Sequence, residues 1–137
     1  MRFSTLATAV HAEDVPAVRD FYVDVLGFTV AMDLGWFVSL RSEGHDDVEV
    51  CVVHRDHAMS AELGGPVRGV VLAFLVDDVD AEYARVVDLG VPVDVALRDE
   101  PWGQRRFLVR DPVGTGIEIV QVTTPDPEWL AEHAPPG

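Results

Sequence analysis

The chain contains two similar runs of apolar residues, 64 positions apart, and each run leads into a helical pattern. The first run covers residues 6–15 and the second covers residues 70–79. Both are rich in residues that favour β-strands, so we expect two largely buried strands. A repeat of this length indicates two copies of one supersecondary unit.

A helix is predicted after each run, because apolar residues recur there at helical spacing and form one apolar face. Asp14 can cap the first helix, with Pro16 in its opening turn, and either Asp78 or Asp80 can cap the second. The apolar face comprises Val15, Val18, Phe21, Tyr22, Val25 and Leu26 in the first copy and Val79, Tyr83, Val86, Val87 and Leu89 in the second.

Three further strands are predicted after each helix. Gly27 and Gly90 can adopt the left-handed conformation that ends a helix, and an extended run starts after each of them. Turn-forming residues at 42–47 and 111–116 separate the last two strands of each copy. The predicted strands are 28–32, 36–40 and 48–53 in the first copy and 91–95, 107–109 and 117–122 in the second.

Each copy is therefore a βαβββ module, which predicts an α+β fold. One helix covers only one face of such a sheet, so we expect the two modules to pair into a curved, eight-stranded mixed sheet that encloses a cleft. A ferredoxin-like α+β domain is the alternative. Within a single domain of residues 1–137, the expected parts are module one (about 3–54), a connector (55–68), module two (about 69–123) and a tail (124–137).

Two short segments outside the modules have sequence patterns that predict local structure. Gly64-Gly65-Pro66 in the connector is typical of a turn and lacks the pattern of a phosphate-binding loop. In the polar, proline-containing tail, Trp129 and Leu130 are free to dock as part of a short helix.

Composition restricts the location of the protein. Hydrophobic residues make up 48% of the 137 residues, and none of the apolar runs approaches the roughly 18 residues of a membrane span. The residues at the N-terminus do not form a signal peptide pattern. The single cysteine, Cys51, cannot pair within the chain, so we expect a cytoplasmic protein with a reduced thiol.

The formal net charge of −14 restricts the partners. Such a field repels a phosphate backbone, so nucleic acid is not an expected partner. It attracts a cationic small molecule. The alternative explanation is that the acidic residues only keep the surface soluble.

Several motifs resemble those of the vicinal oxygen chelate superfamily, which comprises glyoxalases, bleomycin resistance proteins and extradiol dioxygenases. The segment 13–28, with Phe21-Tyr22 ahead of Leu26-Gly27, is similar to the start of the family's first module. Residues 76–80 resemble the start of the second module. The segments 102–107, 111–114 and 117–120 resemble its end, and the likeness covers about residues 3–123.

The resemblance implies a metal site, but this chain departs from it. In metal-dependent relatives, the first and last strands of each module supply one ligand each. The matching positions here are Ala7, Glu49, Val71 and Glu118, so both carboxylates remain and both expected histidines are absent. Zinc needs three or four protein ligands, so we expect no metal and no other cofactor. The metal-dependent glyoxalase I and extradiol dioxygenase reactions are therefore disfavoured, although two carboxylates with water can hold a hard cation weakly.

Glu49 and Glu118 are the main candidate site residues. We expect both to face the cleft, because their apolar neighbours on either side should face the helices. Two facing carboxylates would raise the pKa of one of them, which suits a general base, or both could bind a basic ligand. The alternative is a structural role, with the carboxylates paired to Arg105 or Arg106.

Other side chains are candidates for ligand contact. Trp102 precedes a strand at the expected cleft mouth and Trp36 opens the corresponding strand of module one; flat indoles stack planar ligands and attract cations. Arg105 is a further candidate, and His11 can act at the rim as a hydrogen-bonding or acid–base group. The alternative is a purely structural role, in which the tryptophans are partly buried core residues and His11 is a solvent-exposed residue at the end of its strand.

Two other groups of residues are weaker candidates. Cys51 shares its sheet face with Glu49, whose charge disfavours a reactive thiolate, so we interpret it as a small apolar filler. His54 and His57 have the spacing H-x-x-H, but no third metal ligand accompanies them. Ser-centred nucleophile elbows and paired-cysteine motifs are absent from the sequence.

These observations favour a metal-independent small-molecule-binding protein, similar to the bleomycin resistance branch, that sequesters an antibiotic or a related cationic aromatic compound. The alternatives are a lyase, isomerase or epimerase that uses Glu118 or Glu49 as base, and a regulatory module without catalysis. Whether the protein is an enzyme stays open at this point. We expect a homodimer, because open sheet edges and an open cleft call for a second chain.

Overall fold

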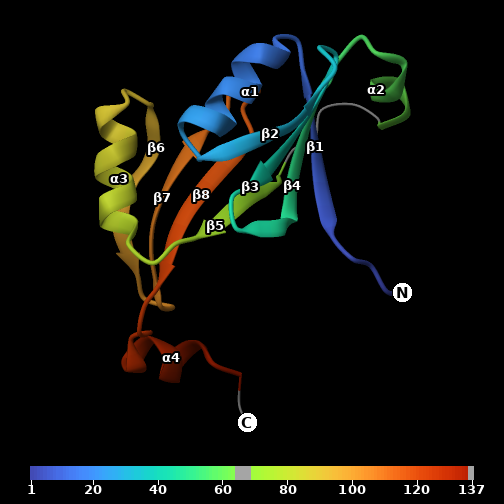
Figure 1. Cartoon of the computed structure of the whole chain (residues 1–137). Coiled ribbons are helices and arrows are strands. Elements are labelled where there is room, and N and C mark those ends of the chain that lie inside the picture. Colours follow the sequence, from blue (N-terminus) through green and yellow to red (C-terminus); the bar gives the residue numbers. More distant parts are fainter. Residues whose placement is uncertain (64–68, 136–137) are drawn as a thin grey trace. The chain divides into compact units, whose positions relative to one another are not determined.

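The structure, a computed structural model, describes residues 1–63 and 69–135, and its secondary structure confirms the α+β class and the two βαβββ modules (Figure 1). The turn predicted at Gly64-Gly65-Pro66 lies outside the described residues. The first module contains β1 (Leu6–Ala12), α1 (Val15–Asp24), β2 (Phe28–Asp33), β3 (Phe37–Ser42) and β4 (His45–His54), and α2 (Ala58–Leu63) follows it. The second module contains β5 (Val71–Leu75), α3 (Val79–Asp88), β6 (Val93–Glu100), β7 (Gln104–Arg110) and β8 (Gly116–Val122), and α4 (Pro127–His133) lies in the tail.

The eight strands form two four-stranded sheets with the same strand order. The order is β1-β4-β3-β2 in the first sheet and β5-β8-β7-β6 in the second. In each sheet the first strand pairs in parallel with the last, and the other pairs are antiparallel. Two compact units contain these sheets, and residues 111–114, between β7 and β8, belong to the first unit.

In the first unit, α1 packs on the sheet through the apolar face that the sequence predicts. Asp14 caps the helix, since its side chain accepts a hydrogen bond from the Ala17 amide at 3.0 Å. Val15, Val18 and Tyr22 are buried beneath the helix. Gly27 has φ 74°, the left-handed conformation expected at the helix end.

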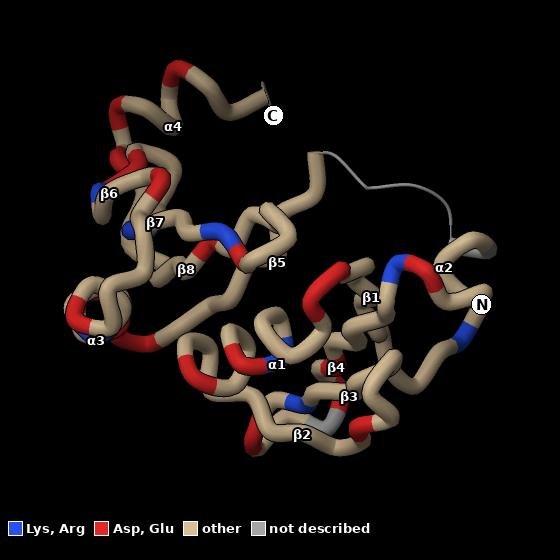
Figure 2. Tube along the Cα trace, turned by 90° about the horizontal axis from the view of Figure 1, so that it is seen from above, with Lys and Arg blue, Asp and Glu red and all other residues tan. Residues whose placement is uncertain are grey.

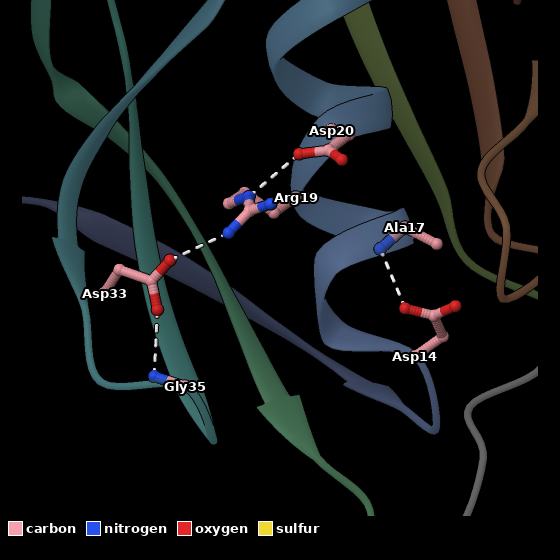
Figure 3. A network of polar contacts seen from close by, with 6 residues as sticks. All are labelled: Asp14, Ala17, Arg19, Asp20, Asp33 and Gly35. Atoms are coloured by element: carbon pink, nitrogen blue, oxygen red, sulfur yellow. Dashed lines mark hydrogen bonds and ion pairs between the residues drawn. The ribbon is translucent and has the colours of Figure 1, made fainter.

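Arg19 connects α1 to the end of β2 on the surface of this unit (Figure 3). Its guanidinium donates hydrogen bonds to Asp20 at 2.8 Å and to Asp33 at 3.0 Å. Asp33 also accepts from the Gly35 amide at 2.8 Å, and together these bonds lower the pKa of Asp33. An exposed network of this kind orients the turn after β2 and adds little stability.

In the second unit, α3 packs on its sheet through a narrower face than the sequence predicts. Asp78, and not Asp80, caps this helix by accepting from the Ala81 amide at 3.0 Å. Val79 and Val86 are buried, but Val87 and Leu89 are 46% and 53% exposed. The expectation for these two was wrong: residues 79, 83 and 86 share one helix face, while Val87 lies beside it and Leu89 lies at the C-cap.

The first strand of each module is more exposed than expected. Leu6 on β1 is 74% exposed, and Val71 and Leu75 on β5 are 46% and 70% exposed. The prediction of largely buried strands holds for only part of β1, where Val10 and Ala12 are buried, and it was wrong for β5. Both are edge strands, each with a hydrogen-bonded neighbour on one side only.

The remaining differences concern the ends of elements. The connector contains α2, and β6 continues five residues beyond the predicted end, to Glu100. β4 begins earlier than predicted, at His45, because Gly44 with φ 79° closes a short turn between β3 and β4. The short helix expected around Trp129 is confirmed, with Asp126 as its N-cap.

A buried hydrogen bond joins α1 to the loop between β7 and β8. The hydroxyl of Tyr22, a fully buried residue, donates to Asp111 Oδ2 at 2.9 Å, and Asp111 is only 4% exposed. Burial, and then the charge of Asp111, raises the pKa of the Tyr22 hydroxyl far above its usual value. Asp111 also accepts from the Val113 amide at 3.0 Å, which shapes the loop.

The Tyr22→Phe substitution tests the importance of this bond. We expect the free energy of unfolding to fall by about 1–3 kcal/mol, because a buried carboxylate loses one of its hydrogen-bond donors. Urea denaturation followed by circular dichroism measures this change.

Tyr83→Phe is the matched control. Tyr83 lies on α3 with its ring edge-on to Phe107 at 5.1 Å, and it is partly exposed. We expect the removal of the Tyr83 hydroxyl to change the free energy of unfolding by less than about 0.5 kcal/mol. Equal effects of the two substitutions would show that the Asp111 bond has no special importance.

Candidate functional site

Glu49 lies in the middle of the first sheet, on β4, and is half-buried. Its neighbours in register are Ala7 on β1 and Arg41 on β3. Ser39 donates a hydrogen bond to Glu49 Oε1 at 2.6 Å, and the Cys51 thiol donates to the same oxygen at 3.7 Å. The strand alternation places all of these side chains on the sheet face opposite the buried Val50 and Val52.

The donors around Glu49 are uncharged. Within residues 1–63 and 69–135, Glu49 takes part in none of the ion pairs, and the nearest cationic residue in register on this face is Arg41 on β3. Cys51 is 8% exposed, and burial together with the charge of Glu49 raises the pKa of its thiol to about 11. This agrees with the interpretation of Cys51 as an unreactive filler.

His11 lies on the same sheet face as Glu49, whereas Trp36 does not. His11 pairs with Val53, and Ala9, two residues earlier, pairs with Cys51, so all four share one face. Trp36 precedes β3, and its ring stacks on His57 with centroids 3.6 Å apart and planes 9° apart. Trp36 and His57 therefore form a separate aromatic pair at the end of the sheet.

Glu118 occupies the equivalent central strand of the second sheet, β8, but its register differs from the expected one. Its neighbours are Ala73 on β5 and Leu108 on β7, whereas Val71 pairs with Gly116. The 64-residue repeat predicts Val71 as the neighbour of Glu118, two residues before the actual neighbour, Ala73, and on the same sheet face. The hydrogen-bonded pairing of β5 with β8 decides which residue of β5 lies next to Glu118, and the spacing of the sequence repeat does not.

Arg106 connects Glu118 to Trp102 within the second unit. One nitrogen of its guanidinium lies 4.0 Å from Glu118 Oε1, and two others lie 3.1 Å from Glu100 Oε1. The same guanidinium lies over the Trp102 ring, 6.0 Å from its centroid. Hydrogen bonds from Arg98 and Arg106 hold the pKa of Glu100 below its usual value.

Arg105 lies on the other face of the same sheet. It makes two hydrogen bonds of 2.9 Å to Asp80 on α3 and an ion pair of 3.2 Å to Asp99. Successive residues on β7 point to opposite faces, so Arg105 contacts the helix while Arg106 contacts Glu118. Arg105 and Arg106 were both candidate partners for the glutamates, and Arg106 is the one that lies near Glu118.

Trp102 lies in the turn between β6 and β7 and is 41% exposed. Its indole nitrogen donates to Gln104 Oε1 at 2.8 Å, which fixes the orientation of the ring. Sequence reasoning did not single out Ser39, Glu100 or Gln104 as site residues. The available signal was the strand alternation on the neighbouring strands, where Ser39 and Arg41 and then Gln104 and Arg106 stand two residues apart.

The residues around the carboxylates do not fit a zinc site. The first-strand neighbour of each glutamate is an alanine, which supplies no ligand atom. In the described parts of the chain, no group of three or more His, Cys, Asp or Glu side chains is arranged to hold a metal ion. His54 and His57 use their Nδ1 atoms to accept hydrogen bonds from the Asp56 and Met59 amides.

A shallow hollow of about 320 Å³ lies at the ends of β5 and β8. It contains none of the glutamates or tryptophans predicted as site residues. Gln121, one of its lining residues, uses its side-chain oxygen to accept a hydrogen bond from the Val79 amide. The lining residues are Leu75, Val76, Asp77, Gln121 and Val122.

The acidic residues are spread over the surface of both units, including α1 and α3 (Figure 2). All ten basic residues are arginines, and most of the described ones pair with surface carboxylates. The excess of negative charge therefore remains after this pairing. None of the helices in the described part of the chain has the length and apolarity needed to span a membrane.

Comparisons with known proteins give relatives in sequence and in structure. An uncharacterized protein of Mycobacterium bovis is 30% identical over 116 residues, which cover 74% of this chain and 72% of the relative. An uncharacterized protein of Mycobacterium tuberculosis is also 30% identical over 116 residues, and the match covers 65% of that relative. Neither name states an activity.

Three solved structures resemble the chain along most of its length. TioX from Micromonospora sp. ML1 has a TM-score of 0.74 at 24% identity and covers 88% of this chain and 99% of its own. TnmS3, an antibiotic binding protein from Streptomyces sp. CB03234, has a TM-score of 0.71 at 27% identity, with 90% and 99% covered. A lactoylglutathione lyase from Agrobacterium tumefaciens has a TM-score of 0.69 at 25% identity, with 86% and 92% covered.

The family match agrees with the fold and with the repeated module. Residues 6–119 match the Glyoxalase/Bleomycin resistance protein/Dioxygenase superfamily, so the match includes the first βαβββ module and most of the second, and it ends within β8. The chain therefore belongs to the Glyoxalase/Bleomycin resistance protein/Dioxygenase superfamily.

Proposed function

We propose that this protein binds a cationic, aromatic small molecule without a metal ion, and that it sequesters an antibiotic or a related compound. Protection would come from affinity alone, with no bond made or broken. The observation that carries this proposal is the alanine beside each glutamate, Ala7 next to Glu49 and Ala73 next to Glu118. The two carboxylates that match metal-ligand positions of the family remain on these sheet faces, while the other two ligands that a metal would need are missing.

The environment of Glu49 supports a cationic ligand. Its Oε1 accepts hydrogen bonds from Ser39 and Cys51, which stabilise the carboxylate without neutralising it. A half-buried charge of this kind attracts an opposite charge more strongly than an exposed one, because less water screens it. The net charge of −14 adds a long-range attraction for cations.

Trp102 supports an aromatic ligand. Its ring is 41% exposed and is held by Gln104, so a planar molecule can stack on it without the ring first losing much freedom. Arg106 lies over the ring as a polar contact, and Glu118 lies near Arg106. We also propose a ligand contact for His11, which lies on the sheet face of Glu49, and a supporting role for Arg105 through α3. Trp36, which stacks on His57 and lies off that face, would contact a ligand only at the end of the sheet. The likeness to TnmS3, an antibiotic binding protein, favours the same class of ligand.

The protein is proposed to act as a homodimer in the cytoplasm. The edge strands β1 and β5 expose apolar side chains, among them Leu6 and Leu75, and an exposed apolar edge favours association with another chain. A reducing compartment suits the single, unpaired Cys51.

An enzymatic function is the second candidate. Ser39 orients the Glu49 carboxylate at 2.6 Å, and an oriented carboxylate suits abstraction of a proton from an acidic C–H group. The likeness to a lactoylglutathione lyase favours a lyase or isomerase. Turnover with a bell-shaped pH profile that is lost in Glu49→Gln or Glu118→Gln would support this candidate over pure binding.

The Glu49→Gln substitution tests the cation contact. The probe is proflavine, a planar aromatic cation, and acridine at mildly alkaline pH supplies the uncharged ring system. We expect the substitution to weaken proflavine binding by about tenfold and to leave acridine binding nearly unchanged, because only the charge–charge attraction is lost. Isothermal titration calorimetry measures both affinities.

Glu43→Gln is the matched control for this substitution. Glu43 is exposed in the turn between β3 and β4, so its substitution removes the same charge from the surface field. An equal loss of proflavine affinity in both variants would contradict a local contact and indicate the general field of the protein.

Native mass spectrometry tests metal independence and assembly together. The expected spectrum has the mass of two chains and no stoichiometric transition metal, even after incubation with zinc or nickel, because alanines replace two of the ligands. One tightly held ion per chain would contradict the proposal. The mass of a single chain at micromolar protein concentration would contradict the proposed homodimer.

Alkylation of Cys51 by iodoacetamide tests whether this face carries a nucleophile. Since the thiol has a pKa of about 11, we expect the rate at neutral pH to be about a hundredfold below that of free cysteine and to rise with pH. Glu49→Gln should accelerate the reaction by lowering that pKa. An ordinary rate at neutral pH would indicate a reactive thiol.

A further inference from the structure

The C-terminal tail is attached to the turn that carries Trp102. The Thr123 amide donates to the Gly103 carbonyl at 2.9 Å, and the Asp126 amide donates to the Pro101 carbonyl at 2.9 Å. Gly103 has φ 98°, and a Cβ at this position would lie 2.7 Å from Pro125 and 2.9 Å from the Thr123 carbonyl oxygen. Only glycine therefore permits this close approach of the tail to the turn.

The attachment places a second tryptophan beside Trp102. Asp126 caps α4 by accepting from the Glu128 and Trp129 amides, and Trp129 follows in the first turn of this helix. The two indole rings lie with their centroids 6.1 Å apart and their planes tilted by 55°. His133 covers one face of Trp129, and at this tilt a planar ring that stacks on one indole meets the other at an angle.

Both indoles are held in place by polar neighbours. Gln104 accepts a hydrogen bond from the Trp102 indole nitrogen at 2.8 Å. The His133 ring stacks on Trp129 with centroids 4.4 Å apart, and its Nδ1 lies 2.8 Å from the Trp129 carbonyl oxygen. Rings that are already oriented bind a planar molecule with a smaller loss of conformational entropy.

The surface around the two indoles is apolar and open. Trp102 is 41% exposed, Leu130 on α4 is 40% exposed, and Val122 at the end of β8 is 65% exposed. Arg106 lies over the Trp102 ring, and its positive charge opposes the stacking of a cation at the same place. The surface therefore suits an uncharged aromatic ring system, or the uncharged part of a larger ligand.

We infer that Trp102 and Trp129 together form a two-walled site for a planar, fused aromatic ring. This inference rests on the proposed function and names the part of the chain that selects the ring. The family match ends at residue 119, so Trp129 lies outside the matched residues. Trp129 would thus be a specificity-determining residue that the tail of this chain supplies.

Substitutions on α4 and in the turn test this inference with acridine as the probe. We expect Trp129→Ala to weaken acridine binding by about tenfold, since one aromatic contact is lost. Trp129→Phe, which keeps a flat ring on α4, should stay within about threefold of the wild-type affinity. Leu130→Ala is the matched control on the same helix and should have a smaller effect than Trp129→Ala.

Gly103→Ala tests the attachment of the tail without changing either indole. The new methyl group should displace the tail, so that acridine binding falls as in Trp129→Ala. Far-ultraviolet circular dichroism provides an independent readout, because two indoles at this distance couple their transitions. This signal should be present in the wild type and lost in Gly103→Ala and in Trp129→Ala, with the urea midpoint confirming that each variant is folded.

The outcomes separate this inference from the proposed function. Wild-type affinity for acridine in a folded Trp129→Ala variant would overturn the two-walled site and leave the proposed function standing. A wild-type chain that binds neither acridine nor proflavine would overturn both. Equal losses in Trp129→Ala and Trp129→Phe would show that helix packing, and not the aromatic ring, carries the effect.

Discussion

The parallel pairing of the first strand with the last strand in each module is the constraint on which the site depends. It inserts β4 and β8 between two neighbours, so a carboxylate on either strand is surrounded by side chains from both sides. A partly buried carboxylate needs hydrogen-bond donors. Ser39 on β3 supplies one to Glu49, while Arg106 on β7 approaches Glu118.

The two modules therefore give the same carboxylate different electrostatic surroundings. Glu49 accepts hydrogen bonds from uncharged donors, whereas Glu118 lies near an arginine that also pairs with Glu100. Under the proposed function, this asymmetry would give the attraction of a cation to the first sheet and the contact with a ring to the second.

The tail adds an aromatic side chain to the second unit. Without it, Trp102 would be a single aromatic side chain at a turn. Gly103 lets the backbone of the tail approach this turn, and α4 then places Trp129 beside Trp102. Selectivity for a ligand can change through such a terminal segment without disturbing the sheets, because the segment packs on a turn and not in the core.

The sequence by itself determined the βαβββ repeat, the cap at Asp14 and the helix ends at Gly27 and Gly90. These features depend on local spacing, which is readable along one chain. It also indicated the two glutamates and Trp102, because alternation and the family motifs mark such positions.

Only the tertiary structure decided which side chains meet. Register made Ala73, and not Val71, the neighbour of Glu118, and strand alternation separated Arg106 from Arg105. Edge positions exposed β1 and β5 although their residues are apolar. Cross-strand register and the docking of a tail depend on contacts between residues far apart in the chain, and local sequence patterns carry no information about those contacts.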